Sequence, residues 1–165
     1  MLVKALLPVA ALFILSACGG SPKPDRALTQ GVRGPGFVVQ VPQSWHVTRP
    51  ANGVVAQKGS FRVSVTTFPL LKTYEPRMFD AVARELDGVA TKLAAQAGGK
   101  VTERITTTVD GRKVRAYRYT GGPTATRIGF VLDGKREYQL LCEVPTGASD
   151  PDGACMLLFD SFTLT

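Results

Sequence analysis

VTERITTTVDGRKVRAYRYTGGPTATRIGFVLDGKREYQLLCEV, residues 101–144, is the stretch that decides the fold. Four runs of alternating apolar and polar residues, 101–109, 112–120, 124–132 and 136–144, are separated by Asp110-Gly111, Gly121-Gly122-Pro123 and Asp133-Gly134. Asp-Gly is a strong hairpin signal, because these residues tolerate the positive φ that a type I′ turn requires. The stretch therefore predicts an antiparallel meander.

A long helix is predicted immediately before the meander. Pro76 suits the first helical turn, where its missing N–H is not needed, and Gly98-Gly99 suits a left-handed exit. Apolar residues recur between these limits at helical spacing: Phe79, Val82, Ala83, Leu86, Ala90, Leu93, Ala94 and Ala97. Such a stripe predicts a helix that covers one face of the sheet.

The segments on either side complete one domain. Strands are expected near 37–41, 45–49, 54–58 and 61–68, with a hairpin turn at Asn52-Gly53. After the meander, Ser149-Asp150-Pro151 is typical of a helix start, which predicts a short helix over 155–159 and an extended end over 161–165. The pattern predicts an α+β domain spanning 37–165, with an antiparallel sheet layered with helices.

The first 36 residues differ in character from this domain. Lys4, an apolar run over 5–15 and small residues before Cys18 indicate an export signal over 1–17, because the run is too short for a membrane-spanning helix. Residues 18–36 are rich in Gly, Pro and charge, and their large aliphatic residues are Leu28 and Val32. We expect this segment to be a flexible tether.

Leu15-Ser16-Ala17-Cys18 resembles the lipobox of bacterial lipoproteins. The resemblance implies cleavage before Cys18 and a diacylglyceryl thioether on its sulfur, which anchors the chain through several acyl chains. We therefore expect a lipid-anchored protein on the extracytoplasmic face of a bacterial membrane. The alternative is an ordinary signal peptide that happens to precede a cysteine.

Two longer phrases resemble a known family. Phe37-Val38-Val39-Gln40-Val41-Pro42-Gln43-Ser44-Trp45 is similar to the opening of PsbP-like domains, and Asp160-Ser161-Phe162-Thr163-Leu164 is similar to their closing phrase. With Tyr138-Gln139-Leu140-Leu141-Cys142 and the later Cys155, the chain looks most like small actinobacterial lipoproteins of the mycobacterial LpqN type. The resemblance implies a PsbP-like α/β/α sandwich and a scaffold or binding role. It implies no catalytic residues, since its motifs are packing residues.

Cysteine usage predicts one disulfide. Once Cys18 is acylated, Cys142 and Cys155 are the thiols that remain. An exported protein favours a bridge between them, and closing a loop of this size is worth about 3 kcal/mol in the chain-entropy model. Two inert buried thiols are the alternative.

Few residues have the chemistry of a catalyst. Ser44 and His46 would share a face of a strand, which makes a weak hydrolase the rival interpretation, but no acidic residue lies nearby in sequence to orient the histidine. Asp150-Pro151-Asp152-Gly153 lacks the later ligands of a calcium loop and is better interpreted as a turn and helix start. The sequence predicts no cofactor and no metal site.

The formal net charge of +7 is concentrated partly in the meander. Arg115, Arg118 and Arg127 are the candidates for an anionic-ligand patch that binds anionic lipid or wall polymer, although strand alternation sends Arg115 and Arg118 to opposite faces. The alternative is a solvated sheet surface, where basic residues discourage edge pairing. Nucleic acid is a poor partner for an exported domain.

These patterns together predict a non-enzymatic binding or accessory module of the cell envelope. Its expected partners are the membrane, through the lipid anchor, and an envelope protein, lipid or glycan. A structural spacer without a ligand is a third interpretation.

Overall fold

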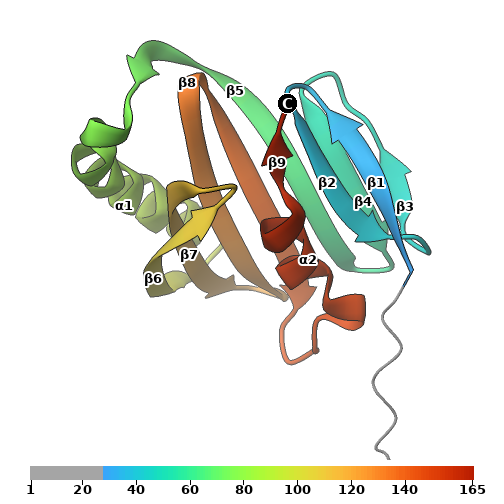
Figure 1. The fold of residues 1–165 in the computed structure, drawn as a ribbon. Coiled ribbons are helices and arrows are strands. Elements are labelled where there is room, and N and C mark those ends of the chain that lie inside the picture. Colours follow the sequence, from blue (N-terminus) through green and yellow to red (C-terminus); the bar gives the residue numbers. More distant parts are fainter. Residues whose placement is uncertain (1–27) are drawn as a thin grey trace, which may run out of the picture.

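The computed structural model describes residues 28–165, which form two antiparallel sheets and two α-helices (Figure 1). The strands are β1 (Thr29–Gly34), β2 (Phe37–Pro42), β3 (His46–Thr48), β4 (Gly53–Lys58), β5 (Phe61–Tyr74), β6 (Lys100–Val109), β7 (Arg112–Gly121), β8 (Thr124–Pro145) and β9 (Thr163–Leu164). The helices are α1 (Phe79–Gln96) and α2 (Ala154–Ser161), each preceded by one 3₁₀ turn, at Pro76–Met78 and Pro151–Gly153. The large sheet has the order β3-β4-β5-β8-β7-β6, and the small one has the order β1-β2-β9.

Strand β8 folds back on itself. Its 22 residues would span about 70 Å if fully extended, yet the backbone N–H of Thr146, just after the strand, donates to the carbonyl of Pro123, just before it, at 2.8 Å. The two arms meet at the top of Figure 1, and Gly134 has the positive φ of a turn residue. The first arm pairs with β7 and the second with β5. The predicted turn at Asp133-Gly134 and the predicted meander are therefore confirmed.

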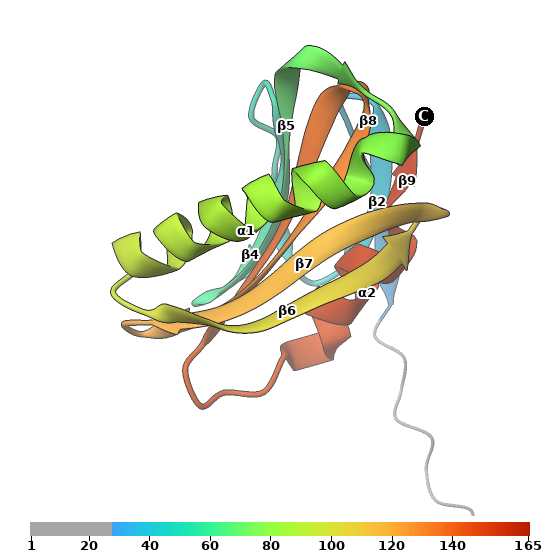
Figure 2. The same ribbon diagram turned by 90° about the vertical axis from the view of Figure 1, so that its left-hand side faces the viewer.

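Both faces of the large sheet are covered. Figures 1 and 2 show α1 on one side and α2 with the small sheet on the other. The core under α1 consists of Leu86, Ala90, Ala94, Tyr117, Tyr119, Ile128 and Phe130. The larger core on the other side gathers residues of both sheets and α2, among them Val39, Val65, Val114, Leu140, Leu158 and Phe162. The α+β class and the helix-layered antiparallel sheet predicted from the sequence are confirmed.

The small sheet corrects one prediction. Residues 29–34, assigned to the flexible tether, form β1 and pair with β2 from Thr29 opposite Pro42 to Gly34 opposite Phe37. The side chain of Val32 is fully buried. The folded domain thus begins before residue 37, because pairing with β2 orders a segment whose own composition is poor in apolar residues. The predicted signal over 1–17 and the first part of the tether lie outside the described residues.

Helix α2 rests closely on the large sheet at Gly129. A Cβ built on Gly129 would lie 2.5 Å from Cε1 of Phe159, so the absence of a side chain is what allows this ring to contact the sheet. Gly88, on the exposed side of α1, has no neighbouring atom within 4 Å of such a Cβ. Packing therefore requires a glycine at position 129 but not at position 88.

We predict that Val32→Asp lowers the free energy of unfolding by about 3 kcal/mol or more, because it places an unpaired charge in the core. Leu28→Asp, at a position where 76% of the side chain is exposed, is the control and should change it by no more than about 0.5 kcal/mol. Urea unfolding monitored by circular dichroism measures both. Equal, small effects would mean that β1 is not part of the folded domain.

We further predict opposite effects of the same substitution at two glycines. Gly129→Ala should destabilise by about 1–3 kcal/mol through overpacking against Phe159, whereas Gly88→Ala should stabilise by up to about 1 kcal/mol through helix propensity. Thermal unfolding of the two variants beside the parent chain tests this. A Gly129→Ala protein as stable as the parent would contradict the close packing of α2.

Candidate functional site

A cleft of about 400 Å³ opens on the α2 side of the large sheet, and it is the best candidate for a binding site. Its floor includes Arg118 of β7 and Arg127 of β8, and its wall includes Asp150, Cys155 and Met156. A second groove of about 620 Å³ lies between α1 and the end of β5. Both cavities combine apolar and charged side chains, but the charged residues of the groove are Lys72, Glu85 and Glu137, whereas those of the cleft are two neighbouring arginines and Asp150.

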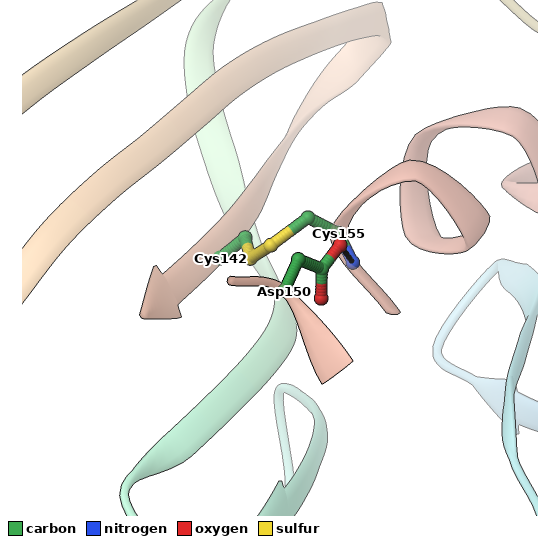
Figure 3. The surroundings of a disulfide bond; sticks show 3 residues. All are labelled: Cys142, Asp150 and Cys155. Atoms are coloured by element: carbon green, nitrogen blue, oxygen red, sulfur yellow. Dashed lines mark hydrogen bonds between the residues drawn. A yellow bond between two sulfur atoms is a disulfide. The ribbon is translucent and has the colours of Figure 1, made fainter. Parts of the chain in front are cut away.

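The wall of the cleft is fixed by a disulfide. Cys142 on the second arm of β8 is bonded to Cys155 at the start of α2, with their Cα atoms 5.5 Å apart (Figure 3). The predicted bridge is therefore confirmed. Beside it, Oδ2 of Asp150 accepts a hydrogen bond from the backbone N–H of Cys155 at 2.9 Å. Burial raises the pKa of Asp150 above its usual value, and the backbone N–H groups of α2 partly oppose that shift.

A polar clamp holds the next turn of the same segment. Oδ2 of Asp152 accepts hydrogen bonds from Nε1 of Trp45 at 3.0 Å and from Nζ of Lys58 at 3.1 Å. The Trp45 hydrogen bond, followed by that of Lys58, lowers the pKa of Asp152. The sequence interpretation of this segment as a turn and helix start agrees with the 3₁₀ turn at Pro151–Gly153 that leads into α2.

Two arginines lie next to each other on the floor. Arg118 and Arg127 are directly opposite in the β7–β8 register. Arg118 is exposed and forms an ion pair with Glu103 at 3.1 Å. Arg127 is half-buried, its guanidinium lies 4.1 Å from the ring centroid of Phe159, and no carboxylate of residues 28–165 forms an ion pair with it. Burial lowers the pKa of Arg127, with a smaller effect from the Arg118 charge, but an arginine stays charged at neutral pH.

Arg115 does not join this pair. It lies on the α1 side, where its Nε donates to Oδ1 of Asp87 at 3.0 Å and its Nη2 donates to Oδ2 at 3.2 Å. The hydroxyl of Tyr117 donates to the same carboxylate at 2.8 Å. The structure therefore divides the predicted patch: Arg118 and Arg127 come together, and Arg115 is a structural partner of α1. The physical reason is strand alternation, which separates positions 115 and 118.

The rival catalytic pair is not assembled. Ser44 and His46 are both exposed, and Ser44 lies in the turn before β3, so the two residues do not share a strand face as the hydrolase hypothesis requires. His46 is opposite Gln57 in the sheet. Within residues 28–165, the side chains of Ser44 and His46 form no hydrogen bond with each other. Neither residue lines the cleft, the groove beside α1 or a third cavity near Pro35.

The described residues contain neither a metal site nor a membrane-spanning helix. No group of three or more His, Cys, Asp or Glu side chains in the range 28–165 has the arrangement of a metal site. No helix in that part of the chain has the length and hydropathy needed to cross a membrane. Cys18, the predicted lipidation site, lies outside the described residues.

The sequence did not predict the residues that surround the two arginines. Glu103 and Met156 were not singled out, Phe159 was predicted only as the end of the short helix, and Asp150 only as part of a helix start. The contact of Glu103 follows from the β6–β7 register, where it faces Arg118. The contact of Phe159 with Arg127 joins segments that share no local pattern, so no signal in the sequence points to it.

The fold matches that of a solved structure. The solution structure of cyanobacterial PsbP from Synechocystis superposes with a TM-score of 0.56 at 15% identity, covering 92% of this chain and 99% of that one. A protein from Bacteroides thetaiotaomicron matches with a TM-score of 0.42 at 8% identity, covering 85% of this chain and 49% of that one. Neither the family models nor the curated proteins contain a match. The fold is therefore PsbP-like, as the sequence resemblance implied.

The ion pair between Asp87 and Arg115 makes the stability of the fold depend on pH. The Arg115 hydrogen bond holds the pKa of Asp87 below its usual value, so the ionised carboxylate stabilises the fold above about pH 4, and this contribution is lost as pH falls through the lowered pKa. Asp87→Asn should destabilise by about 1 kcal/mol at pH 7, since the pair is partly exposed. The difference from the parent should shrink as pH falls below about 4, because the carboxyl becomes protonated.

Urea unfolding between pH 7 and pH 2.5 measures this difference. Glu85→Gln removes a negative charge two residues earlier on the same helix and serves as the matched control, with a profile parallel to that of the parent. A parallel profile for Asp87→Asn as well would show that this pair contributes nothing to acid sensitivity.

Proposed function

We propose that this chain is a non-enzymatic binding or accessory module of the bacterial cell envelope, anchored to a membrane through acylated Cys18. Two features of the sequence support the location: the export signal over 1–17 and the lipobox-like Leu15-Ser16-Ala17-Cys18. The PsbP-like fold is compatible with an accessory role. The resemblance of Tyr138-Gln139-Leu140-Leu141-Cys142 and the later Cys155 to actinobacterial lipoproteins of the LpqN type, which is a resemblance in sequence, favours the same interpretation.

The composition of the cleft is the observation that carries the proposal. Arg118 and Arg127 lie together on its floor beside apolar side chains, which suits recognition of an anionic group. Both cysteines of the cleft are in the disulfide, and no histidine is among its lining residues, which all belong to the described range. Hydroxyl groups and the Asp150 carboxylate also line the cleft, but the hydrogen bond of Asp150 comes from the backbone of Cys155 and not from one of these hydroxyls, so the described residues show no activated nucleophile there.

The expected partners follow from location and charge. A chain held by acyl chains near a membrane surface meets anionic lipid headgroups, envelope proteins and wall polymers. A positive formal charge of +7 favours the anionic members of this group. The hydrolase that would use Ser44 and His46 has no observation in its favour, and the structural spacer is disfavoured by the presence of a shaped cleft.

The anchor is tested by metabolic labelling with a fatty acid in a bacterial host, followed by fractionation. The full chain should carry the label and remain with the membrane fraction, whereas Cys18→Ser should carry none and be released. Cys142→Ala with Cys155→Ala is the control, and it should retain the label because these residues serve the disulfide. An unlabelled parent chain, or a mature N-terminus other than Cys18, would refute the proposed anchoring.

The non-enzymatic character is tested on the same preparations. The parent chain should hydrolyse a panel of ester substrates no faster than buffer does. Hydrolysis that is abolished by His46→Ala would replace the binding module with the rival enzyme.

A further inference from the structure

Arg127 is the charged side chain of the cleft whose contacts are incomplete. One face of its guanidinium contacts the ring of Phe159, and its Nε is buried without a hydrogen-bond acceptor among residues 28–165. A buried donor that has no acceptor costs free energy, and for a charged group the cost is greater. The protein therefore maintains, at the floor of a cleft, a cation that its own described residues do not satisfy.

Arg118 increases this cost. Two like charges directly opposite in an antiparallel pair have Cβ atoms about 5 Å apart and destabilise the sheet. Glu103 lies opposite Arg118 in the β6–β7 register and forms an ion pair with it at 3.1 Å, whereas Glu103 and Asp160 act on Arg127 only as more distant charges. No carboxylate of residues 28–165 forms an ion pair with Arg127, which is among the residues that line the cleft.

Asp150 contributes a carboxyl group to the wall of the same cleft. Its Oδ2 is occupied by the backbone N–H of Cys155, but its Oδ1 is buried and has no donor among the described residues. Asp150 lies in the wall of the cleft, and the arginines lie in its floor. Because Oδ1 has almost no accessible surface, a ligand in the cleft meets the charges of the two arginines and the apolar lining rather than this oxygen.

We propose that the cleft binds a phosphate ester, with the phosphate between Arg118 and Arg127 and the organic part of the ester against the apolar lining. This inference rests on the proposed function as a binding module and names its ligand class. A phosphate carries more negative charge than a carboxylate, and its tetrahedral set of oxygens can face two guanidinium groups that approach from different directions.

The remaining lining accommodates the organic part. Val144, Ala148, Met156 and the disulfide give the cleft an apolar side next to its charged floor. The volume of about 400 Å³ is within the range of small-ligand sites. A glycerol phosphate group occurs both in soluble esters and in the headgroups of anionic lipids. Competition between a soluble ester and lipid vesicles distinguishes these two sources.

The test titrates the oxidised full-length chain, in a neutral detergent, with glycerol 3-phosphate, and observes the arginine Nε–H signals by NMR. The signals of Arg127 and Arg118 should shift with saturation, while that of Arg115 on the opposite face should not. Free glycerol should cause no saturable shift, because it lacks the anion, and added salt should weaken the binding. Inorganic phosphate should bind more weakly than the ester, since it makes no contact with the wall.

Variants separate ligand binding from a structural role. Arg127→Lys retains the charge but loses the planar fork, and should weaken binding about tenfold. Glu103→Gln frees Arg118 and should strengthen binding severalfold, which a purely structural role of the cluster would not produce. Arg115→Lys is the matched control and should leave affinity unchanged. Near-ultraviolet circular dichroism confirms that each variant is folded.

Vesicles of phosphatidylglycerol in a neutral lipid identify the source. Displacement of glycerol 3-phosphate from the Arg127 site by these vesicles supports the headgroup as ligand, and saturation by the soluble ester without displacement supports a free phosphate ester. Absence of a saturable shift at Arg127, or an affinity unaffected by both Arg127→Lys and Glu103→Gln, would overturn the proposal. If phosphate does not bind but Cys18 is acylated, the phosphate site is refuted and the proposed function is not. If phosphate binds but the parent chain is not acylated, the proposed anchor is refuted and the phosphate site is not.

Discussion

Burial of the large sheet on both faces is the constraint on which the rest of the structure depends. In β7 the consecutive residues Ala116 and Tyr117 both have zero exposure, one facing α2 and the small sheet, the other facing α1. Strand alternation thus has to supply two cores at once. Arg118 and Arg127 lie toward an end of their strands on the α2 side, where the core stops and the cleft begins.

Local pattern accounts for most of the fold. The meander and α1 were predictable because their signals lie within short stretches of sequence. These signals are the alternation of apolar and polar residues, the Asp-Gly turns and an apolar stripe at helical spacing, and the structure confirms both elements. Strand β1 was not, since Val32 is the buried residue of a segment otherwise rich in Gly and charge. Its order comes from β2 and from the core beneath, which are tertiary effects that composition does not report.

The site was predictable to a smaller extent. The bridge between Cys142 and Cys155 followed from cysteine number and the expected compartment. The pairing of Arg118 with Arg127 is also implicit in the turn at Gly121-Gly122-Pro123, because a turn sets the register of its strands. The contact of Arg127 with Phe159 and the placement of Asp150 depend on how α2 returns across the sheet, and this long-range geometry leaves no short sequence signature.

The wall of the cleft has a consequence for how such proteins diversify. The segment after β8 is held at its far end by the disulfide at Cys155 and by Asp152, which binds Trp45 and Lys58, while residues 146–149 belong to neither core. Loop closure costs rise slowly with length. Residues 146–149 are therefore a natural point of insertion or grafting, where related chains can acquire new selectivity without redesigning the scaffold.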